Sequence, residues 1–409
     1  MEDVRSLVAV LALAAVSGEA QQKLGPLDAV RLALERNQYL AAAANRIDSA
    51  KGLAVQAGLK PNSRLFLQVE NARLPVFSPF RYENETDNFA YLSRVFETAG
   101  KRLRRADLAS ENVKGAERNL DLQRTQIAGQ VLTSYWNAVG ARRLAAVLAE
   151  SLEVLGRTVE YHKIRVKEGA LPEADLLRVQ LEYQQVAINH RNAEQEARRS
   201  LQLLFRDIGS EPEPSVELTG DLLRMDAPID PGDLDTAIDR RPDVRLVRQT
   251  TEQAQANLRL QKANAVPDPE ALFGYKRTIG MNTTVAGVQI NLPFHNRNQG
   301  AIAAAAADVT AAGSTLRAAR TAGRTEIEAA IGEYRQKRDL VDQMLPTLSE
   351  QANETRRIAD AVYREGASDL LRLLDAERVR IQAETQQVRS LIELRHAAIN
   401  LQVALGLLP

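Results

Sequence analysis

The sequence repeats one plan twice, and this duplication constrains the fold more than any other feature. Residues 50–61 align with residues 256–267, and the turn at residues 168–170 aligns with the turn at residues 365–367. Corresponding segments keep the same order in both halves, which is typical of an internally duplicated protein. The predicted organisation is an export signal at 1–20, a first repeat at 21–209, a Pro- and Glu-rich linker at 210–232 and a second repeat at 233–409.

Each repeat is predicted to contain a helix, two short strands, a very long helix, a tight turn and a returning helix. In the second repeat Ala286, Val288, Ile290 and Leu292 alternate with small or polar residues. This period of two indicates a strand with one face against hydrocarbon or a core and one against water. The first helix is expected at residues 27–60, and the strands at residues 63–73, 88–96, 270–279 and 284–293.

Two long stretches, residues 102–168 and 300–365, are predicted to be coiled-coil helices. Only Pro346 interrupts their helical pattern. Roughly 65 residues at about 1.5 Å per residue would give a rod of about 100 Å. Ile327 and Tyr334 belong to a seven-residue spacing that is characteristic of a coiled-coil seam. We therefore expect the long helices to pack side by side.

Four strands per chain pose a physical problem. Strands of about 10 residues are long enough to cross an outer membrane at a tilt, but unpaired strand edges are not stable in lipid. Several copies would have to close one barrel, and their long helices would form a tube continuous with it. In such a barrel, Ala286, Val288, Ile290 and Leu292 are the expected lipid-facing residues. The number of strands per chain does not by itself decide whether two copies or three close the barrel.

Composition argues against several classes of function. The 53 Lys and Arg residues balance 53 Asp and Glu residues, so the basic excess of a nucleic-acid-binding protein is missing. The chain has no Cys, which excludes thiol nucleophiles and Cys-zinc sites, and its four His residues form no local metal motif. Carboxylates are abundant throughout, so no catalytic pair stands out. We expect no enzymatic activity, no cofactor and no metal site.

The N-terminus is predicted to be an export signal. The apolar run at residues 6–16 is too short to span a bilayer as a helix, and the small residues Gly18 and Ala20 follow it. Glu2 and Asp3 depart from the basic start that is typical of such signals. A misassigned start codon and a short buried helix are the alternatives.

Six motifs, in order along both repeats, resemble the outer membrane efflux proteins, the TolC-like family. They are PLDAVRLALERN at 26–37, VFETAGKR at 95–102, EGALPEADLLRVQ at 168–180, DLDTAIDRRPDV at 233–244, LPFHNRNQGAI at 292–302 and YREGASDLLRLLDAE at 363–377. The resemblance covers essentially the whole mature chain. It implies a mainly helical chain with a membrane β-barrel portion, closing as a homotrimer with a 12-stranded barrel in the outer membrane of a Gram-negative cell and a helical tunnel across the periplasm.

The resemblance also implies partners and a cargo. Members of the family dock onto a periplasmic adaptor, or membrane fusion protein, and an inner-membrane efflux pump. The GKR and NRNQG segments at residues 100–102 and 296–300 resemble the subgroup that serves heavy-metal exporting pumps. The expected function is a passive exit duct for heavy-metal cations or small toxic compounds. A soluble periplasmic coiled-coil scaffold is the alternative, but it leaves the alternating segments unexplained. Substrate, pump, adaptor and gate state stay open.

A gate at the periplasmic mouth follows from the same resemblance. Asp375 matches an acidic residue that rings the mouth in the family, and Arg372 stands where the prototype has a second acid. Tyr363 and Asp175 match a pair that hydrogen-bonds the returning helices shut. Without the resemblance, a Tyr and an Asp near a helical turn would be taken for ordinary surface groups.

The two helical turns are the candidate docking tips. Gly169 and Gly366 stand where each long helix must reverse, and glycine readily adopts the positive φ found at helix C-termini. The turn alone accounts for these glycines. The resemblance adds the expectation that the adaptor's helical hairpins meet the tips at Arg165, Gly169, Ala170, Gly366 and Ala367.

Overall fold

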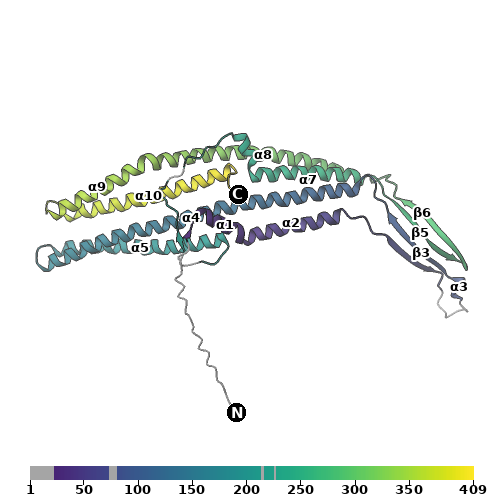
Figure 1. Ribbon diagram of the computed structural model, residues 1–409, viewed down its shortest axis with the longest axis horizontal. Coiled ribbons are helices and arrows are strands. Elements are labelled where there is room, and N and C mark those ends of the chain that lie inside the picture. The colour runs from purple at the N-terminus through teal and green to yellow at the C-terminus, as the bar shows by residue number, and fades with distance from the viewer. Residues whose placement is uncertain (1–22, 73–80, 213–215, 225–226) are drawn as a thin grey trace, which may run out of the picture. The chain divides into compact units, whose positions relative to one another are not determined.

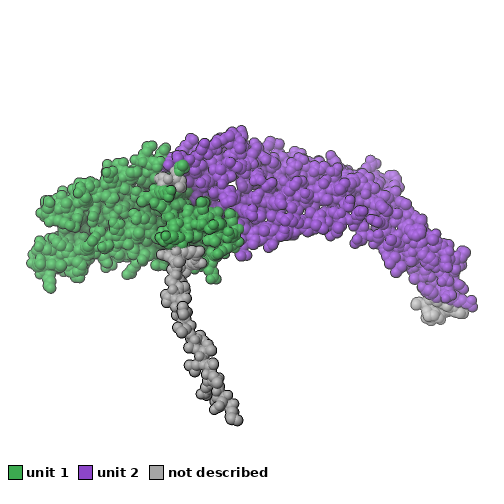
Figure 2. All heavy atoms as spheres, viewed as in Figure 1, with its two compact units in different colours: residues 1–36, 130–227, 339–396 green, residues 37–129, 228–338, 397–409 purple. Residues whose placement is uncertain are grey.

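The computed structural model describes residues 23–72, 81–212, 216–224 and 227–409, and the predicted export signal at 1–20 lies outside them (Figure 1). Within the described residues, no helix is long and apolar enough to cross a membrane. The chain forms two compact units (Figure 2). Unit 1 comprises residues 1–36, 130–227 and 339–396, and unit 2 comprises residues 37–129, 228–338 and 397–409.

Unit 1 is built from helices. They are α1 (Pro26–Arg36), the end of α4 (Lys101–Lys167), α5 (Glu173–Ile208), α9 (Leu345–Arg364) and most of α10 (Leu370–Ala404). Leu148 and Leu155 of α4 pack with Val179 of α5 and Leu374 of α10 in one buried apolar cluster. The seven-residue step from Leu148 to Leu155 places both side chains on the face of α4 that meets the neighbouring helices. A short parallel pair, β1 (Lys23–Leu24) and β4 (Glu217–Leu218), completes the unit.

Unit 2 combines helices with a four-stranded sheet. Its helices are α2 (Gln38–Ala57), the start of α4, α3 (Tyr82–Glu85), α6 (Leu234–Arg240), α7 (Pro242–Asn264) and α8 (Gln299–Asp339). The strands are β2 (Arg64–Glu70), β3 (Asp87–Val95), β5 (Pro269–Thr278) and β6 (Met281–Ile290). They are antiparallel in the order β2-β3-β5-β6, so β2 and β6 are the sheet edges. A tight turn at Ile279 and Gly280, both at positive φ, joins β5 to β6.

The strands lie close to the predicted positions, but two predicted helices are interrupted. The helix expected at 27–60 breaks at Asn37, whose side chain accepts a hydrogen bond from Tyr39 N at 2.9 Å and caps α2. Asparagine is favoured at this position because its side-chain oxygen accepts a hydrogen bond from a free N–H group at the start of the helix. The helix expected at 300–365 is interrupted by a π-helical turn, η1 (Leu340–Met344), just before Pro346. Proline cannot donate the backbone bond that would continue the α-helical ladder.

The compact units do not coincide with the two predicted repeats. Each unit draws segments from both halves of the sequence. The halves nevertheless have a similar element order, with two helices, two long strands, a long helical stretch and a returning helix in each. The boundaries of the repeats and of the linker stay a prediction.

Candidate functional site

The two predicted tips adopt the same turn. Gly169 has φ +72° and Gly366 has φ +73°. Ala170 N donates to the Arg165 carbonyl at 2.8 Å, and Ala367 N donates to the Val362 carbonyl at 3.1 Å. This six-to-one bond after a left-handed glycine is the Schellman motif that ends many helices. The sequence alignment of the two turns therefore corresponds to a shared backbone geometry, with exposed Arg165, Ala170 and Ala367 beside the glycines.

Tyr363 binds a histidine that joins the two helical hairpins of unit 1. Its hydroxyl lies 2.6 Å from His162 Nε2, and the two rings stack with centroids 5.9 Å apart. His162 is on α4 and is fully buried, whereas Tyr363 is on α9. The pair therefore connects the α4–α5 hairpin to the α9–α10 hairpin close to their tips.

The second ring nitrogen of His162 decides the direction of this hydrogen bond. Nδ1 lies 2.8 Å from the Thr158 carbonyl oxygen. A carbonyl only accepts, so Nδ1 carries the hydrogen and, in the neutral ring, Nε2 is the acceptor. We assign the Tyr363 hydroxyl as the donor to Nε2 on this basis. Burial raises the pKa of Tyr363, and the nearby Tyr161 and Asp175 raise it further, so Tyr363 stays protonated as a donor.

The other predicted gate residues occupy the same end of unit 1. Asp175 lies in the first turn of α5 and is half-buried. Its negative charge adds to the burial that raises the pKa of Tyr363, but the Tyr363 hydroxyl hydrogen-bonds to His162. Arg372 and Asp375 lie on the first turns of α10 with exposed side chains. The Arg372 backbone N–H donates to Asp369 Oδ1 at 3.1 Å, which caps this helix.

A buried polar layer, which the sequence patterns did not reveal, lies further along α10. Arg380 and Glu377 are both nearly inaccessible and are joined at 2.8 Å. Arg380 also reaches Glu384 at 2.7 Å and the buried Ser151 hydroxyl of α4 at 2.6 Å. Burial lowers the pKa of Arg380, but hydrogen bonds to the two acids outweigh it and raise the pKa overall. The layer fixes α10 against α4.

The sheet presents one apolar face and one face of mixed polarity. Register places Ala286 beside Phe273, Val288 beside Ala271 and Ile290 beside Pro269 on the same face. The opposite face is mixed. It carries Gln289, Glu270 and Arg64 together with the stacked rings of Phe66 and Tyr91. On the apolar face Phe273 is 66% and Val288 68% exposed, and Leu292, just beyond β6, is also exposed. The four residues predicted to face lipid thus lie along one exposed apolar surface.

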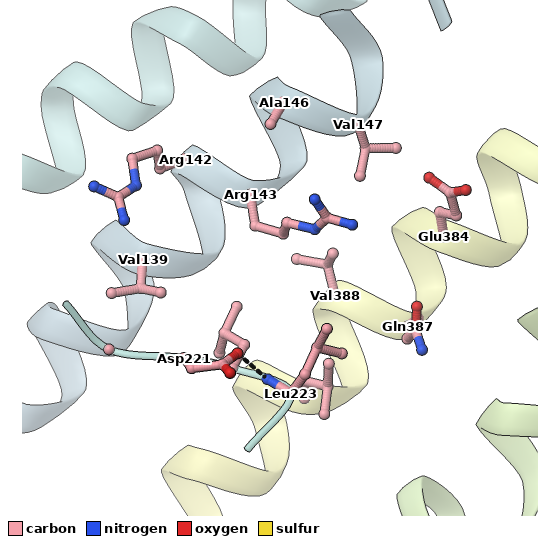
Figure 3. Close-up of a pocket in the computed structure, with 13 residues that line it drawn as sticks. Val139, Arg142, Arg143, Ala146, Val147, Asp221, Leu223, Glu384, Gln387 and Val388 are labelled. Carbon is pink, nitrogen blue, oxygen red and sulfur yellow. Dashed lines mark hydrogen bonds between the residues drawn. The ribbon is translucent and has the colours of Figure 1, made fainter. Parts of the chain in front are cut away.

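A cavity of about 320 Å³ in unit 1 lies between α4, α10 and residues 220–223 (Figure 3). Arg142 and Arg143 of α4 and Glu384 of α10 line it. Arg142 donates to the Leu218 carbonyl at 2.7 Å, so this arginine holds the chain segment against the helices. The Tyr135 hydroxyl accepts from Gly220 N at 2.8 Å and secures the same segment. The cavity thus lies where the predicted linker is bound to the helices.

Comparison with known proteins finds similar efflux proteins. The sequence profile described as "Outer membrane efflux protein" matches residues 234–407. The cobalt-zinc-cadmium resistance protein CzcC of Cupriavidus metallidurans is 25% identical over 391 residues, which are 94% of this chain and 91% of that protein. Over residues 234–407 this chain is thus similar to the outer membrane efflux proteins, and over most of its length it is similar to CzcC. The protein is therefore an outer-membrane protein with a periplasmic helical portion, and not an enzyme.

Solved structures share the fold of this chain. A membrane protein from Pseudomonas aeruginosa superposes with a TM-score of 0.80 at 19% identity, covering 95% of this chain and 93% of that one. The open state of the Neisseria gonorrhoeae MtrE outer membrane channel gives a TM-score of 0.79 at 18% identity, covering 93% and 88%. At these identities the likeness concerns the fold.

Proposed function

We propose that this efflux protein is the outer-membrane channel of a tripartite efflux system. Three copies would form a passive exit duct that docks onto a periplasmic adaptor and an inner-membrane pump. The observation that carries the proposal is the exposed apolar face of the four-stranded sheet, joined in one chain to coiled-coil helices. Such a face is expected in lipid, where only closed barrels and helices satisfy every backbone group.

The edges of the sheet support closure by identical copies. Neighbouring strands are antiparallel in the order β2-β3-β5-β6, so the edge strands β2 and β6 run in opposite directions. β6 of one copy would therefore pair with β2 of the next in the same antiparallel manner, and three copies of the four strands would make the 12-stranded barrel. Closure removes both free edges, which a single chain leaves unpaired.

The tips support docking by a helical partner. Arg165, Ala170 and Ala367 are exposed beside two turns of identical geometry. Two equivalent tips per chain would give a trimer six similar contact points around its mouth, which suits a ring of repeated adaptor hairpins. The adaptor contacts assigned to Gly169 and Gly366 are part of this proposal.

Heavy-metal cations are the favoured cargo. The support is the similarity to a cobalt-zinc-cadmium resistance protein along 94% of the chain. Asp375 is exposed near the mouth, and one copy per subunit would make a ring of carboxylates that attracts cations. Small toxic compounds are the second candidate cargo. Asp375→Asn should lower cation over anion selectivity in a planar bilayer, while Arg372→Gln should leave it unchanged or raise it.

Detergent extraction of the membrane fraction, followed by light scattering, tests the assembly. The expected mass is three times that of the mature chain, and the purified protein should form pores in a planar bilayer. Expression in a strain that lacks the channel of its cobalt-zinc-cadmium efflux system should restore metal resistance. Recovery of a stable monomer with full β content from the periplasmic soluble fraction would instead establish the scaffold alternative.

A further inference from the structure

A basic cavity lies in unit 2 where β3 ends and α4 begins. It has a volume of about 360 Å³, and its wall includes Lys60, Arg94, Phe96, Arg102 and Leu103. The strands continue from the ends of the helices at this point (Figure 1). The cavity therefore marks the level at which the exposed sheet gives way to helices.

The turn beneath the cavity is held in place by contacts to the start of β5. Thr98 N donates to Asp268 Oδ1 at 2.7 Å, and the Thr98 hydroxyl donates to the Pro267 carbonyl at 2.8 Å. Lys101, which is almost fully buried, forms an ion pair with Asp268 at 2.7 Å. The wall is thus fixed before any ligand arrives, which lowers the entropic cost of binding.

The charges of the wall do not cancel. Glu97, the acid in the wall, is already paired with Arg105, and Lys101 is paired with Asp268. Among the described residues, Lys60, Arg94 and Arg102 form no ion pair, and the recorded neighbour of the Arg94 guanidinium is the Phe96 ring at 5.7 Å. Three cations without an acidic partner at one cavity are suited to an anionic ligand.

The position of Arg94 identifies the kind of anion. Strand alternation places Arg94 on the same face as Leu92, and it pairs across the sheet with Ala271, the neighbour of Val288. This is the exposed apolar face. Phe96 and Leu103, both more than half exposed, continue the apolar surface beside the cations. Basic and aromatic side chains at the end of an apolar band are typical of the depth at which lipid headgroups lie.

We propose that this cavity binds the phosphate of an anionic phospholipid in the leaflet that faces the helices. Arg94 and Arg102 contact the phosphate oxygens, Lys60 adds a third positive charge, and an acyl chain follows Leu92 and Phe96. Guanidinium groups suit this role because they donate paired hydrogen bonds to phosphate. The inference rests on the proposed placement of the sheet in the membrane.

The test measures lipid binding to the purified full-length protein in neutral detergent. The probes are short-chain phosphatidylglycerol, short-chain phosphatidylcholine and inorganic phosphate, followed by native mass spectrometry and thermal shift. Removing each cation should weaken phosphatidylglycerol binding about fivefold, so Arg94→Gln/Arg102→Gln should weaken it about 25-fold. Arg94→Lys/Arg102→Lys, which keeps the charge, should retain most of the binding.

Arg104→Gln is the matched control, because Arg104 is on the same turn of α4 but outside the cavity wall and pairs with Asp107 at 3.3 Å. It should bind phosphatidylglycerol like the wild type. Three results would each overturn the proposal: phosphatidylcholine binding as tightly as phosphatidylglycerol, inorganic phosphate binding as tightly as phosphatidylglycerol, or unchanged phosphatidylglycerol binding by the double Gln variant.

In phosphatidylcholine bilayers the wild type and the double variant should conduct alike. A wild type without conductance would refute the channel, while its lipid preference is judged separately in detergent.

Discussion

Apolar side chains are buried in the helical hairpins but exposed on the sheet. In the hairpins Leu155, Val179 and Leu374 are buried against other helices of the same chain. In the sheet Phe273 and Val288 keep about two-thirds of their surface accessible. Full burial of such a side chain contributes roughly 1.5–3 kcal/mol. A single chain therefore stabilises its hairpins by itself, whereas in the proposed channel the sheet would gain stability from lipid and from neighbouring copies.

Polar groups show the same contrast. Inside the hairpins the buried Arg380, Glu377 and Ser151 satisfy one another. At the sheet edges β2 and β6 each have one neighbouring strand. In the proposed barrel, the backbone groups on their outer sides would pair with another copy. Substitutions in the hairpins should consequently change the unfolding of one chain, and substitutions in the sheet should change insertion and assembly.

The largest effect is expected when the buried polar layer of the hairpins loses its central cation. Arg380→Met leaves Glu377 and Glu384 without their main partner and should destabilise the protein by about 3–5 kcal/mol. Arg389→Met on the same helix is the control, because Arg389 is exposed and should cost little. Unfolding followed by circular dichroism in detergent measures both. Equal costs would show that the layer is not a structural element of the hairpins.

A somewhat smaller effect is expected in the sheet, and it depends on the face. Ala286→Arg places a charge beside Phe273 near the middle of the apolar face and should cost about 2–4 kcal/mol of insertion free energy. Gln289→Arg lies on the opposite face beside Glu270 and should be tolerated. Folding into lipid vesicles measures both. If the two variants insert equally well, the apolar face does not contact lipid.

The sequence predicted the sheet better than it predicted the contacts of the hairpins. Period-two alternation is a local signal, so the four strands were located correctly to within about three residues. The helix break at Asn37 was missed, because a single capping side chain leaves little trace in an apolar pattern. The trimer, the gate and the docking contacts involve surfaces of several chains, and their assignment stays a prediction.

His162 shows why the candidate site was only partly predictable. Its bonding partner Tyr363 is 201 residues away, and no local spacing links the two. A signal was nevertheless present: Leu148, Leu155 and His162 follow one another at steps of seven along α4, which places the histidine in the buried seam. A polar residue at a seam position requires a partner, and Tyr363 on α9 supplies it.

Replacing glycine by alanine should change the stability by a smaller amount, with one sign in a hairpin turn and the opposite sign inside a helix. Gly366→Ala forces a Cβ into positive φ and should cost about 1–2 kcal/mol, although no atom lies within 4 Å of the added carbon. Gly332→Ala, inside α8 and equally free of close neighbours, should stabilise by about 0.5–1 kcal/mol. Thermal unfolding in detergent measures both. Destabilisation by both variants would mean that the backbone conformation at Gly366 is not the cause.

The smallest change in stability is expected at the hydrogen bond between the two hairpins, where the effect on conductance should be larger. Tyr363→Phe removes the donor to His162 Nε2 and should cost about 1 kcal/mol while keeping the stacked ring. If this bond holds the proposed gate closed, Tyr363→Phe should raise the open time of the channel in a planar bilayer. His162→Leu should do the same, and the double variant should add little, because both substitutions remove one interaction. Asp175→Asn serves as the comparison and should change conductance less, since the Tyr363 hydroxyl bonds to His162 and the charge of Asp175 makes a smaller contribution to its pKa than burial does. A larger effect of Asp175→Asn than of His162→Leu would instead identify the carboxylate as the partner that keeps the mouth closed.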